Sequence, residues 1–242
     1  MELHLSELDT DRFGISVAKM ILKQGDSVVQ LFDLCIAAGV KLLIARVAAE
    51  ERDLINELEA GGASLADTLL YHSKAIEARH AIPLAPAFRM RLANADDASS
   101  VEALARRAFN GYTGHYHNDV RLDKRDANEV YASWARNCCL KMSADEVFVV
   151  EHKGEIIAFA AVRRIDDATI DCPLCAVESH WRGRRLLDAL LTQCESWALD
   201  KGYASIEYST HCSNVQARSV IERSGFVAYR SVHTYHKWFN AH

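Results

Sequence analysis

The chain has 242 residues, of which 50% are hydrophobic and 25% charged, and its 28 Lys and Arg against 33 Asp and Glu give a formal net charge of −5. This composition is typical of a globular protein, and the mild acidity disfavours a protein whose main task is to neutralise nucleic-acid phosphates. With only 11 Gly and 3 Pro, the disordered and fibrous classes are poor fits. The length permits one large domain or two small ones.

The first part of the chain alternates strand and helix patterns. Hydrophobic periodicity and the glycines that follow each pattern predict a strand, a helix, a strand, a helix and a strand over 13–22, 27–38, 41–47, 50–60 and 65–76. Residues 80–87 then contain two of the three prolines between periodic segments, which is typical of a linker. We therefore expect a small N-terminal α/β accessory domain over 1–79 and a larger domain over 88–242.

The second part begins with a short strand and ends in aromatic, strand-like sequence. Helices are predicted over 98–109, 128–140, 184–199 and 214–223, and the residues at 111–123 read as a polar loop rich in Tyr and His. Strands are predicted over 88–92, 146–151, 155–163, 169–177 and 205–210, with two more at the end of the chain.

A weak internal repeat relates the two parts. Gly61, Tyr71 and His72 recur with the same spacing as Gly225, Tyr235 and His236. Three matched residues can arise by chance, but both copies share the order strand, helix, glycine, strand. We interpret the first domain as a truncated relative of the second.

Seven cysteines, an odd number, favour a reducing compartment over a disulfide framework. The acidic N-terminus lacks the pattern of a secretory signal, and no apolar run reaches the ~20 residues of a membrane helix, so a cytoplasmic location without membrane contact is expected. Cys172 and Cys175 have CxxC spacing, but no second Cys or His pair follows at the spacing of a zinc site. We expect no metal and a structural role for both thiols.

The chemistry is predicted at the start of the helix over 184–199. A strand end, a compact turn and a long amphipathic helix follow one another there, and the free backbone N–H groups and the dipole of a helix start favour an anion. Arg182, Arg184 and Arg185 add positive charge. A pyrophosphate fits this pattern, and the alternative is a solvated basic turn.

The segment from Val177 through Arg182-Gly183 to Leu190-Leu191 resembles the acetyl-CoA signature of the general-control-related N-acetyltransferase (GNAT) superfamily. Asn214 and the following helix up to Gly225-Phe226 resemble that superfamily's next helix. The resemblance implies an α/β fold, a GNAT-like domain with a mostly antiparallel, splayed mixed sheet, and acetyl-CoA as co-substrate. The cofactor-binding residues that it implies are Ala176, Val177, Arg182, Gly183, Arg184, Arg185, Leu186, Leu187 and Asn214.

Two features of the superfamily pattern are missing. Its glycines fall on Arg185 and Leu187, which leaves Gly183 alone and predicts a crowded pyrophosphate turn. The tyrosine that serves many members as general acid is replaced by Ile221, which cannot donate a proton.

A closer likeness is to the dTDP-fucosamine acetyltransferase type, which acetylates a nucleotide-linked amino sugar. It rests on Phe13-Gly14 in the N-terminal region, on Ala108-Phe109 before the polar loop with Tyr131 and Trp134 after it, and on the aromatic end at 234–238. The resemblance implies transfer of acetyl to a dTDP-amino-dideoxyhexose for surface polysaccharide synthesis. Stacking rings and donors for this substrate are expected in the loop, on Tyr112, His115, Tyr116, His117 and Asn118.

Acyl transfer from a thioester to an amine requires proton transfer. Tyr208, His211, Tyr235 and His236 are available for it. We select Tyr208, on the strand before Asn214, and His236, because histidine titrates near neutrality. Tyr235 and His236 alternate faces, so at most one points into the cleft. A mechanism without a dedicated acid stays open.

Other functions remain open on the sequence. The same fold could acetylate another small amine or a protein amine, could bind CoA without turnover, or could use a larger acyl donor or an acyl carrier. A homodimer formed through sheet edges is plausible, and no nucleic-acid partner is expected.

Overall fold

A computed structural model describes residues 2–77 and 82–239. The first half alternates strands and helices, and its helices end at left-handed glycines or tight turns. Its elements are β1 (His4–Leu5), α1 (Glu7–Phe13), β2 (Val17–Leu22), α2 (Val28–Ala37), β3 (Leu42–Ala48), α3 (Arg52–Ala60) and β4 (Ser64–Ala75).

The second half contains longer helices on both sides of its strands. The N-terminal elements of this half are β5 (Phe88–Leu92), a 3₁₀ turn (Ala95–Asp97), α4 (Ala98–Ala108), α5 (His115–Asn118), α6 (Lys124–Cys139), β6 (Glu146–His152) and β7 (Glu155–Arg164). They are followed by β8 (Thr169–Cys172), β9 (Cys175–Val177), a second 3₁₀ turn (Ser179–Trp181), α7 (Leu186–Asp200), β10 (Ser205–His211), α8 (Val215–Arg223) and β11 (Val227–Trp238).

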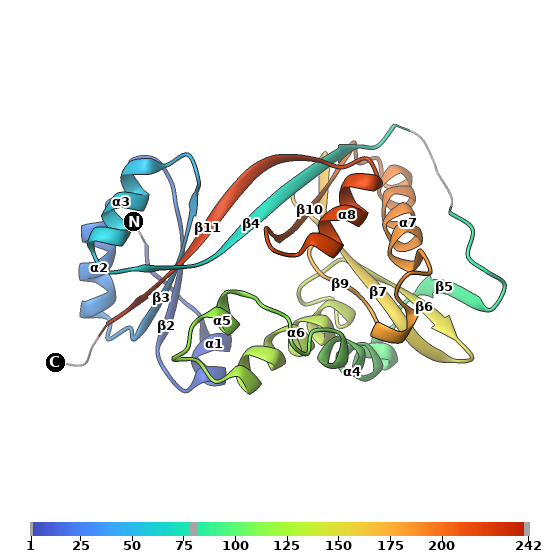
Figure 1. The fold of residues 1–242 in the computed structure, drawn as a ribbon, viewed down its shortest axis with the longest axis horizontal. Coiled ribbons are helices and arrows are strands. Elements are labelled where there is room, and N and C mark those ends of the chain that lie inside the picture. Colours follow the sequence, from blue (N-terminus) through green and yellow to red (C-terminus); the bar gives the residue numbers. More distant parts are fainter. Residues whose placement is uncertain (1, 78–81, 240–242) are drawn as a thin grey trace.

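A single sheet runs through the whole elongated molecule (Figure 1). Its strand order is β1-β2-β3-β11-β4-β10-β8-β7-β6-β5, and β9 pairs with β7 off this path. Most pairs are antiparallel, while β2–β3 and β8–β10 are parallel. This is the mixed, mostly antiparallel sheet that the sequence predicts.

The two longest strands join the halves by exchange. β4, from the first half, pairs with β10, and β11, from the second half, pairs with β3, while β4 and β11 also pair with each other. Each half ends in the order strand, helix, strand, helix, long strand (β2 to β4 and β9 to β11), and each gives that last strand to the sheet of the other. The internal repeat predicted from the sequence therefore has a structural counterpart in the element order.

The division into domains over 1–79 and 88–242 stays a prediction. In the structure the two halves share one continuous sheet. Residues 80 and 81 of the predicted linker lie outside the described residues, and residues 82–87 form neither helix nor strand. Among the helices that the structure describes, none is both long enough and apolar enough to cross a membrane.

Four predicted elements differ from the structure. The strand expected over 13–22 starts at Val17, because helix α1 occupies residues up to Phe13 and ends at Gly14 with φ +64°. The strand expected over 169–177 breaks at Pro173, which has no N–H for a sheet ladder. The polar loop contains the one-turn helix α5, and the two terminal strands are one strand with two bulges.

Four packed clusters stabilise these layers. On one face of the second half, α7 buries Leu190, Leu191 and Cys194 completely against the sheet, at roughly 1.5–3 kcal/mol per leucine. On the other face lie α4 and α6. In the first half, α2 and α3 cover one face, while α1, α5 and the start of α6 cover the other. The large cavity described below lies on the side of the sheet that α4, α5 and α6 cover.

Candidate functional site

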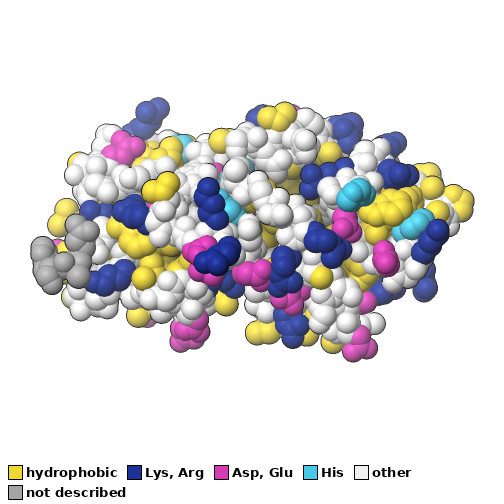
Figure 2. All heavy atoms as spheres, turned by 60° about the horizontal axis from the view of Figure 1, so that its bottom comes forward, with side chains coloured by type: hydrophobic (Ala, Val, Ile, Leu, Met, Phe, Trp, Pro, Cys, Tyr) yellow, Lys and Arg dark blue, Asp and Glu magenta, His cyan; other side chains and the backbone are white. Residues whose placement is uncertain are grey.

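A cavity of about 1690 Å³ lies between the sheet and the covering elements α4, α5 and α6, and it is lined by both halves of the chain. It exceeds the roughly 300–1,000 Å³ of ordinary ligand sites, so it has room for two substrates. Figure 2 shows one face of the molecule, on which many Lys and Arg side chains are exposed although the net charge is −5.

The cavity opens where two strands separate. β8 pairs with β10 up to Cys172, and after Pro173 the chain continues as β9, which pairs only with β7. The Leu174 carbonyl and the Glu178 N–H form hydrogen bonds with β7. Because backbone groups alternate in direction along a strand, the N–H groups of Cys175 and Val177 point away from β7, into the opening. The splayed sheet expected from the family resemblance is therefore present, with unpaired donors along its edge.

The turn before α7 has the geometry of an anion site. Gly183 (φ +76°) and Arg185 (φ +60°) are left-handed, and Ala189 is the first residue whose N–H bonds back into the helix, to the Arg185 carbonyl at 3.1 Å. Within the described residues, the N–H groups of residues 183–188 have no acceptor. These donors and the helix dipole fit the pyrophosphate of CoA.

The three arginines of this turn have different positions. Arg185 lines the cavity and is exposed. Arg182 also lines it, but its guanidinium donates to the carbonyls of Val177 and Ala108, both at 3.3 Å. The Arg184 side chain stacks on Trp181 with 5.0 Å to the ring centroid, and Arg184 is not among the cavity-lining residues. At Arg184 the backbone N–H, not the guanidinium, is the group available to the cofactor.

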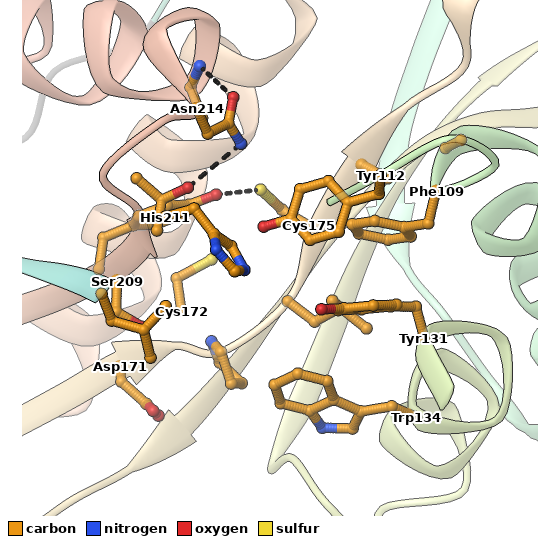
Figure 3. Close-up of a pocket in the computed structure, with 18 of the residues that line it drawn as sticks. Phe109, Tyr112, Tyr131, Trp134, Asp171, Cys172, Cys175, Ser209, His211 and Asn214 are labelled. Atoms are coloured by element: carbon orange, nitrogen blue, oxygen red, sulfur yellow. Dashed lines mark hydrogen bonds between the residues drawn. The ribbon is translucent and has the colours of Figure 1, made fainter. Parts of the chain in front are cut away.

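The remaining predicted cofactor residues line the cavity, namely Ala176, Val177, Gly183, Leu186, Leu187 and Asn214. Asn214 is also the N-cap of α8: its side chain accepts from the Ala217 N–H and donates to Thr210 Oγ1, as Figure 3 shows. Ile221 is completely buried and does not line the cavity, so no proton donor takes the place of the family's tyrosine on this helix.

Tyr208, one of the two selected proton-transfer residues, lies in the cavity wall. It is 7% exposed, and its hydroxyl is 2.8 Å from Cys175 Sγ. Burial, followed by the nearby Cys175, raises the pKa of Tyr208 well above 10. The hydroxyl therefore stays protonated, which is the form of a proton donor.

A buried His–Asp pair contacts Tyr112 in the cavity wall. His211 Nδ1 is 2.5 Å from Asp67 Oδ1, and the His211 ring meets Tyr112 edge to face (Figure 3). Since a carboxylate only accepts, it holds the Nδ1–H tautomer and leaves Nε2 as an acceptor. The sequence identifies His211 as one of four proton-transfer residues but gives no sign of Asp67, which comes from a distant strand.

His236 lies behind the cavity wall. It is 2% exposed, and its Nδ1 is 2.9 Å from Asp119 Oδ2, which also accepts from Trp238 Nε1 at 2.6 Å. His236 Nε2 is 2.9 Å from Nδ1 of His115, and His115 lines the cavity. His236, selected from the sequence for proton transfer, therefore does not line the cavity, and His115 lies between it and the cavity. Tyr235 points to the other face and donates to Glu59 at 2.7 Å.

The predicted substrate loop divides into two sets of residues. Helix α5 turns His115 and Tyr116 inward, where they are buried and line the cavity together with Tyr112. His117 instead bonds Asn128, and Asn118 donates to the Ala66 carbonyl at 2.8 Å. His117 and Asn118 do not line the cavity, so the expectation that they bind substrate is corrected to a role in holding the loop.

The wall opposite the strands is aromatic. Phe109 and Tyr131 stack at 4.7 Å, Tyr112 meets both edge to face, and Trp134 lies beside Tyr131 (Figure 3). Gly114 is required where α5 begins, because a Cβ there would lie 2.3 Å from the Tyr131 hydroxyl oxygen. The absence of a side chain at Gly114 therefore lets the start of α5 lie close to both Tyr131 and His211 Nε2.

The CxxC cysteines are both free. A hydrogen bond with Cys172, together with burial, raises the pKa of Cys175 well above 9, so it is an unreactive thiol. In the part of the chain that the structure describes, no three His, Cys, Asp or Glu side chains group as metal ligands would.

Comparison with known proteins agrees with this geometry. Residues 104–226 match the model of the acetyltransferase (GNAT) family. The spore coat polysaccharide biosynthesis protein SpsD of Bacillus subtilis (strain 168) is 29% identical over 154 residues, which are 63% of this chain and 52% of SpsD. The chain thus spans about half the length of this curated relative.

Solved structures match the fold of nearly the whole chain. A GCN5-related N-acetyltransferase from Sphaerobacter thermophilus superposes with a TM-score of 0.65 at 12% identity, covering 94% of this chain and 74% of that protein. A tandem GNAT protein from the clavulanic acid biosynthesis pathway gives the same TM-score at 14% identity, covering 93% and 76%. At these identities the likeness concerns the fold alone.

Proposed function

The chain belongs to the acetyltransferase (GNAT) family, and we propose that it transfers an acetyl group from acetyl-CoA to the amine of a nucleotide-linked amino sugar used in surface polysaccharide synthesis. The single observation that carries the proposal is one cavity that joins an anion-binding helix start to the His211–Asp67 pair.

The cofactor end of the cavity suits acetyl-CoA. The free N–H groups of residues 183–188 are donors for a pyrophosphate, and the edge of β9 offers the N–H groups of Cys175 and Val177 to the pantetheine arm and the thioester carbonyl. Acetyl-CoA supplies an activated acyl group whose transfer leaves a thiolate. A neutral donor on the β9 edge stabilises the charge that develops on the carbonyl oxygen.

His211 is the proposed general base. Asp67 fixes its tautomer, so Nε2 can take a proton from the acceptor's ammonium or from the attacking amine. Tyr208, beside Cys175 at the point where the strands separate, is the proposed donor to the departing thiolate. His115, backed by His236 and Asp119, provides a second imidazole on the acceptor side.

The acceptor class is inferred from the size and chemistry of the remaining space. The part of the cavity lined by the first half of the chain includes Lys19, Arg46 and Tyr71, and rings suited to stacking lie on Tyr112 and Trp134. The relative SpsD is named for polysaccharide biosynthesis, and the sequence resembles amino-sugar acetyltransferases. A nucleotide-linked amino sugar combines a base that stacks, an anionic linkage and an amine.

Binding of the two substrates tests the proposal. Thermal unfolding is measured with acetyl-CoA alone, and with CoA together with each of several dTDP-4-amino sugars. A ligand at about 100 times its Kd should stabilise the protein by roughly 2.7 kcal/mol. We expect one stabilisation from acetyl-CoA and a further one from an amino-sugar nucleotide. No effect of any CoA species would overturn the proposal, and an effect of CoA with none from the sugars would favour a small amine, a protein amine, or CoA binding without turnover.

A further inference from the structure

One face of the central sheet carries a row of polar side chains across three neighbouring strands. Arg46 on β3 lies opposite Thr234 on β11, and Thr234 lies opposite Asp67 on β4. Directly opposed residues point to the same face, so the three side chains stand side by side beneath the acceptor part of the cavity. Arg46 and Asp67 both line this cavity.

Arg46 is a cavity-lining cation without a counter-charge in the protein. It is half-buried, and across residues 2–77 and 82–239 no hydrogen bond or ion pair involves its guanidinium. Of the other cations that line the cavity, Lys19 pairs with Asp9 and Arg163 pairs with Asp171, whereas Arg230 stacks on Tyr71. Holding a guanidinium partly out of water without a counter-charge is costly, unless a ligand supplies that charge.

Two further polar atoms beside Arg46 lack partners. Among the described residues, Thr234 Oγ1 and Asp67 Oδ2 are buried and make no hydrogen bond. Asp67 as a whole is 8% exposed. Buried polar atoms in native proteins are normally satisfied. Since Asp67 lines the cavity and Thr234 does not, the unpaired oxygen of Asp67 is the one that points to a bound molecule. Asp67 can only accept, and it therefore calls for a donor such as a hydroxyl or an amine.

The spacing of the strands sets the size of that molecule. Arg46 and Asp67 are two strands apart, which places their Cα atoms roughly 10 Å from each other. A molecule that satisfies both carries its anion at one end and its donors at the other. The donor end then lies beside His211, the proposed base, because His211 is bonded to Asp67.

We propose that Arg46 binds a phosphate oxyanion of the acceptor, so that the acceptor's amine is held between Asp67 and His211. The inference rests on the proposed function in taking this cavity as the acceptor site. A guanidinium presents two parallel donors that match two phosphate oxygens, and it keeps its charge at every relevant pH. Arg46 thus selects phosphorylated acceptors over neutral amines.

The test measures binding to the full chain with its cofactor site filled by saturating CoA, since phosphate probes would otherwise occupy the start of α7. The probes are dTDP, inorganic phosphate, thymidine and galacturonate, each titrated calorimetrically into wild type, Arg46→Ala, Arg46→Lys and Arg52→Ala. Arg52 is an exposed residue of the same half outside the cavity, so it is the matched control. Affinity for CoA checks that each variant is folded.

We expect dTDP to bind wild type and the Arg52→Ala variant equally, and to bind Arg46→Ala about tenfold or more weakly, with CoA affinity unchanged. Arg46→Lys keeps the charge but not the paired donors, so it should lie between the two. Stronger binding of dTDP than of phosphate identifies a nucleotide-linked anion, and the reverse identifies a simple sugar phosphate.

Three outcomes overturn the inference: dTDP and phosphate both fail to bind wild type, the Arg46→Ala variant binds them as wild type does, or galacturonate binds better than either phosphate probe. Arg230, which stacks on Tyr71 at 4.2 Å and also lines the cavity, is the rival cation. If Arg230→Ala loses dTDP binding and Arg46→Ala does not, Arg46 is not the site. Binding that depends on Arg46 without acetylation of any amino sugar would reject the proposed function and retain this inference.

Discussion

At the scale of single residues, the site depends on buried polar pairs whose members are far apart in the chain. His211 belongs to β10 and Asp67 to β4, and their contact exists because β4 is inserted beside β10. His236 on β11 likewise bonds residues distant in the chain, namely His115 in α5 and Asp119 directly after it.

Replacing His211 with Asn should lower kcat by about 10²–10⁴-fold, because the proposed base is lost while the ring's space is largely filled. Binding of acetyl-CoA should change little, since His211 lies away from the α7 turn. Steady-state rates across pH 5–9 and a CoA titration measure both quantities. His4→Asn, on the exposed strand β1, is the control. A variant at His211 that keeps half of the wild-type kcat would reject its role.

Replacing Tyr208 with Phe removes the hydroxyl and leaves the ring that packs in the core. We expect kcat to fall by about 10²-fold or more if this hydroxyl protonates the leaving thiolate, with KM for the acceptor within a few-fold of wild type. With an acetyl donor whose thiol is more acidic than CoA, the fall in kcat should be smaller, because that thiolate can depart without receiving a proton. An equal defect with both donors would assign Tyr208 a structural role.

Acidification should destabilise the protein through His115. Burial, followed by the positive charges of His236 and Arg46, holds the pKa of His115 well below 6.5. The unfolded chain therefore binds a proton below about pH 6.5 that the folded chain does not. This contribution to stability is full above pH 6.5 and is lost as the pH falls from there towards the folded pKa, by up to about 1.4 kcal/mol per pH unit.

Urea unfolding of wild type and of His115→Gln between pH 5 and pH 8 measures this effect. The variant should show a flatter fall in the free energy of unfolding between pH 7 and pH 5. Asp119 does not interfere, because its pKa is lowered by bonds to His236 and Trp238 against the effect of burial, so its contribution is lost only in more acidic solution. Equal slopes in the two proteins would contradict the assignment.

At the scale of elements, the turn before α7 is held in a conformation that its sequence does not favour. Arg185 adopts φ +60°, at a position where the family resemblance expects glycine. A left-handed residue with a side chain costs about 1–2 kcal/mol, and glycine avoids this cost while losing roughly 0.5–1 kcal/mol of chain entropy.

The substitution Arg185→Gly should therefore raise the free energy of unfolding by about 0.5–1 kcal/mol. Arg184→Gly is the matched control, since Arg184 does not have a positive φ and should gain nothing. Chemical denaturation of the two variants beside wild type provides the measurement. Destabilisation by both substitutions to the same extent would show that Arg185 is not strained.

The elements of the cofactor side were predictable from local pattern. The amphipathic stripe of α7 predicts that helix, while Val177, Gly183 and Leu186 were implied as cofactor-binding residues by the family resemblance; all three line the cavity. The predicted elements differ from the structure where a local feature interrupts the pattern of the flanking residues. Pro173 divides one expected strand into β8 and β9, and the one-turn helix α5 turns His115 and Tyr116 inward while His117 and Asn118 turn away.

At the scale of the whole molecule, the two halves complete each other. The exchange of β4 and β11 makes one sheet (Figure 1). The part of the cavity that we assign to the acceptor is lined by residues of β3 and β4. Periodicity predicts each of these strands separately, but it does not predict which strands pair across the chain. For that reason Asp67, Arg46 and the covering of His236 by His115 could not be derived from the sequence.

The central claim is that this acetyltransferase acts on a nucleotide-linked amino sugar, and the most direct test is the ratio of kcat/KM for matched acceptors. Acetyl transfer from acetyl-CoA is followed by mass spectrometry with a dTDP-4-amino sugar and with the same amino sugar lacking the nucleotide. We predict an N-acetylated product and a kcat/KM at least about 100-fold higher for the nucleotide-linked form, because binding energy from the remote nucleotide lowers the barrier. Equal values for the two acceptors, or acetylation of simple amines with none of any nucleotide-linked sugar, would contradict the claim.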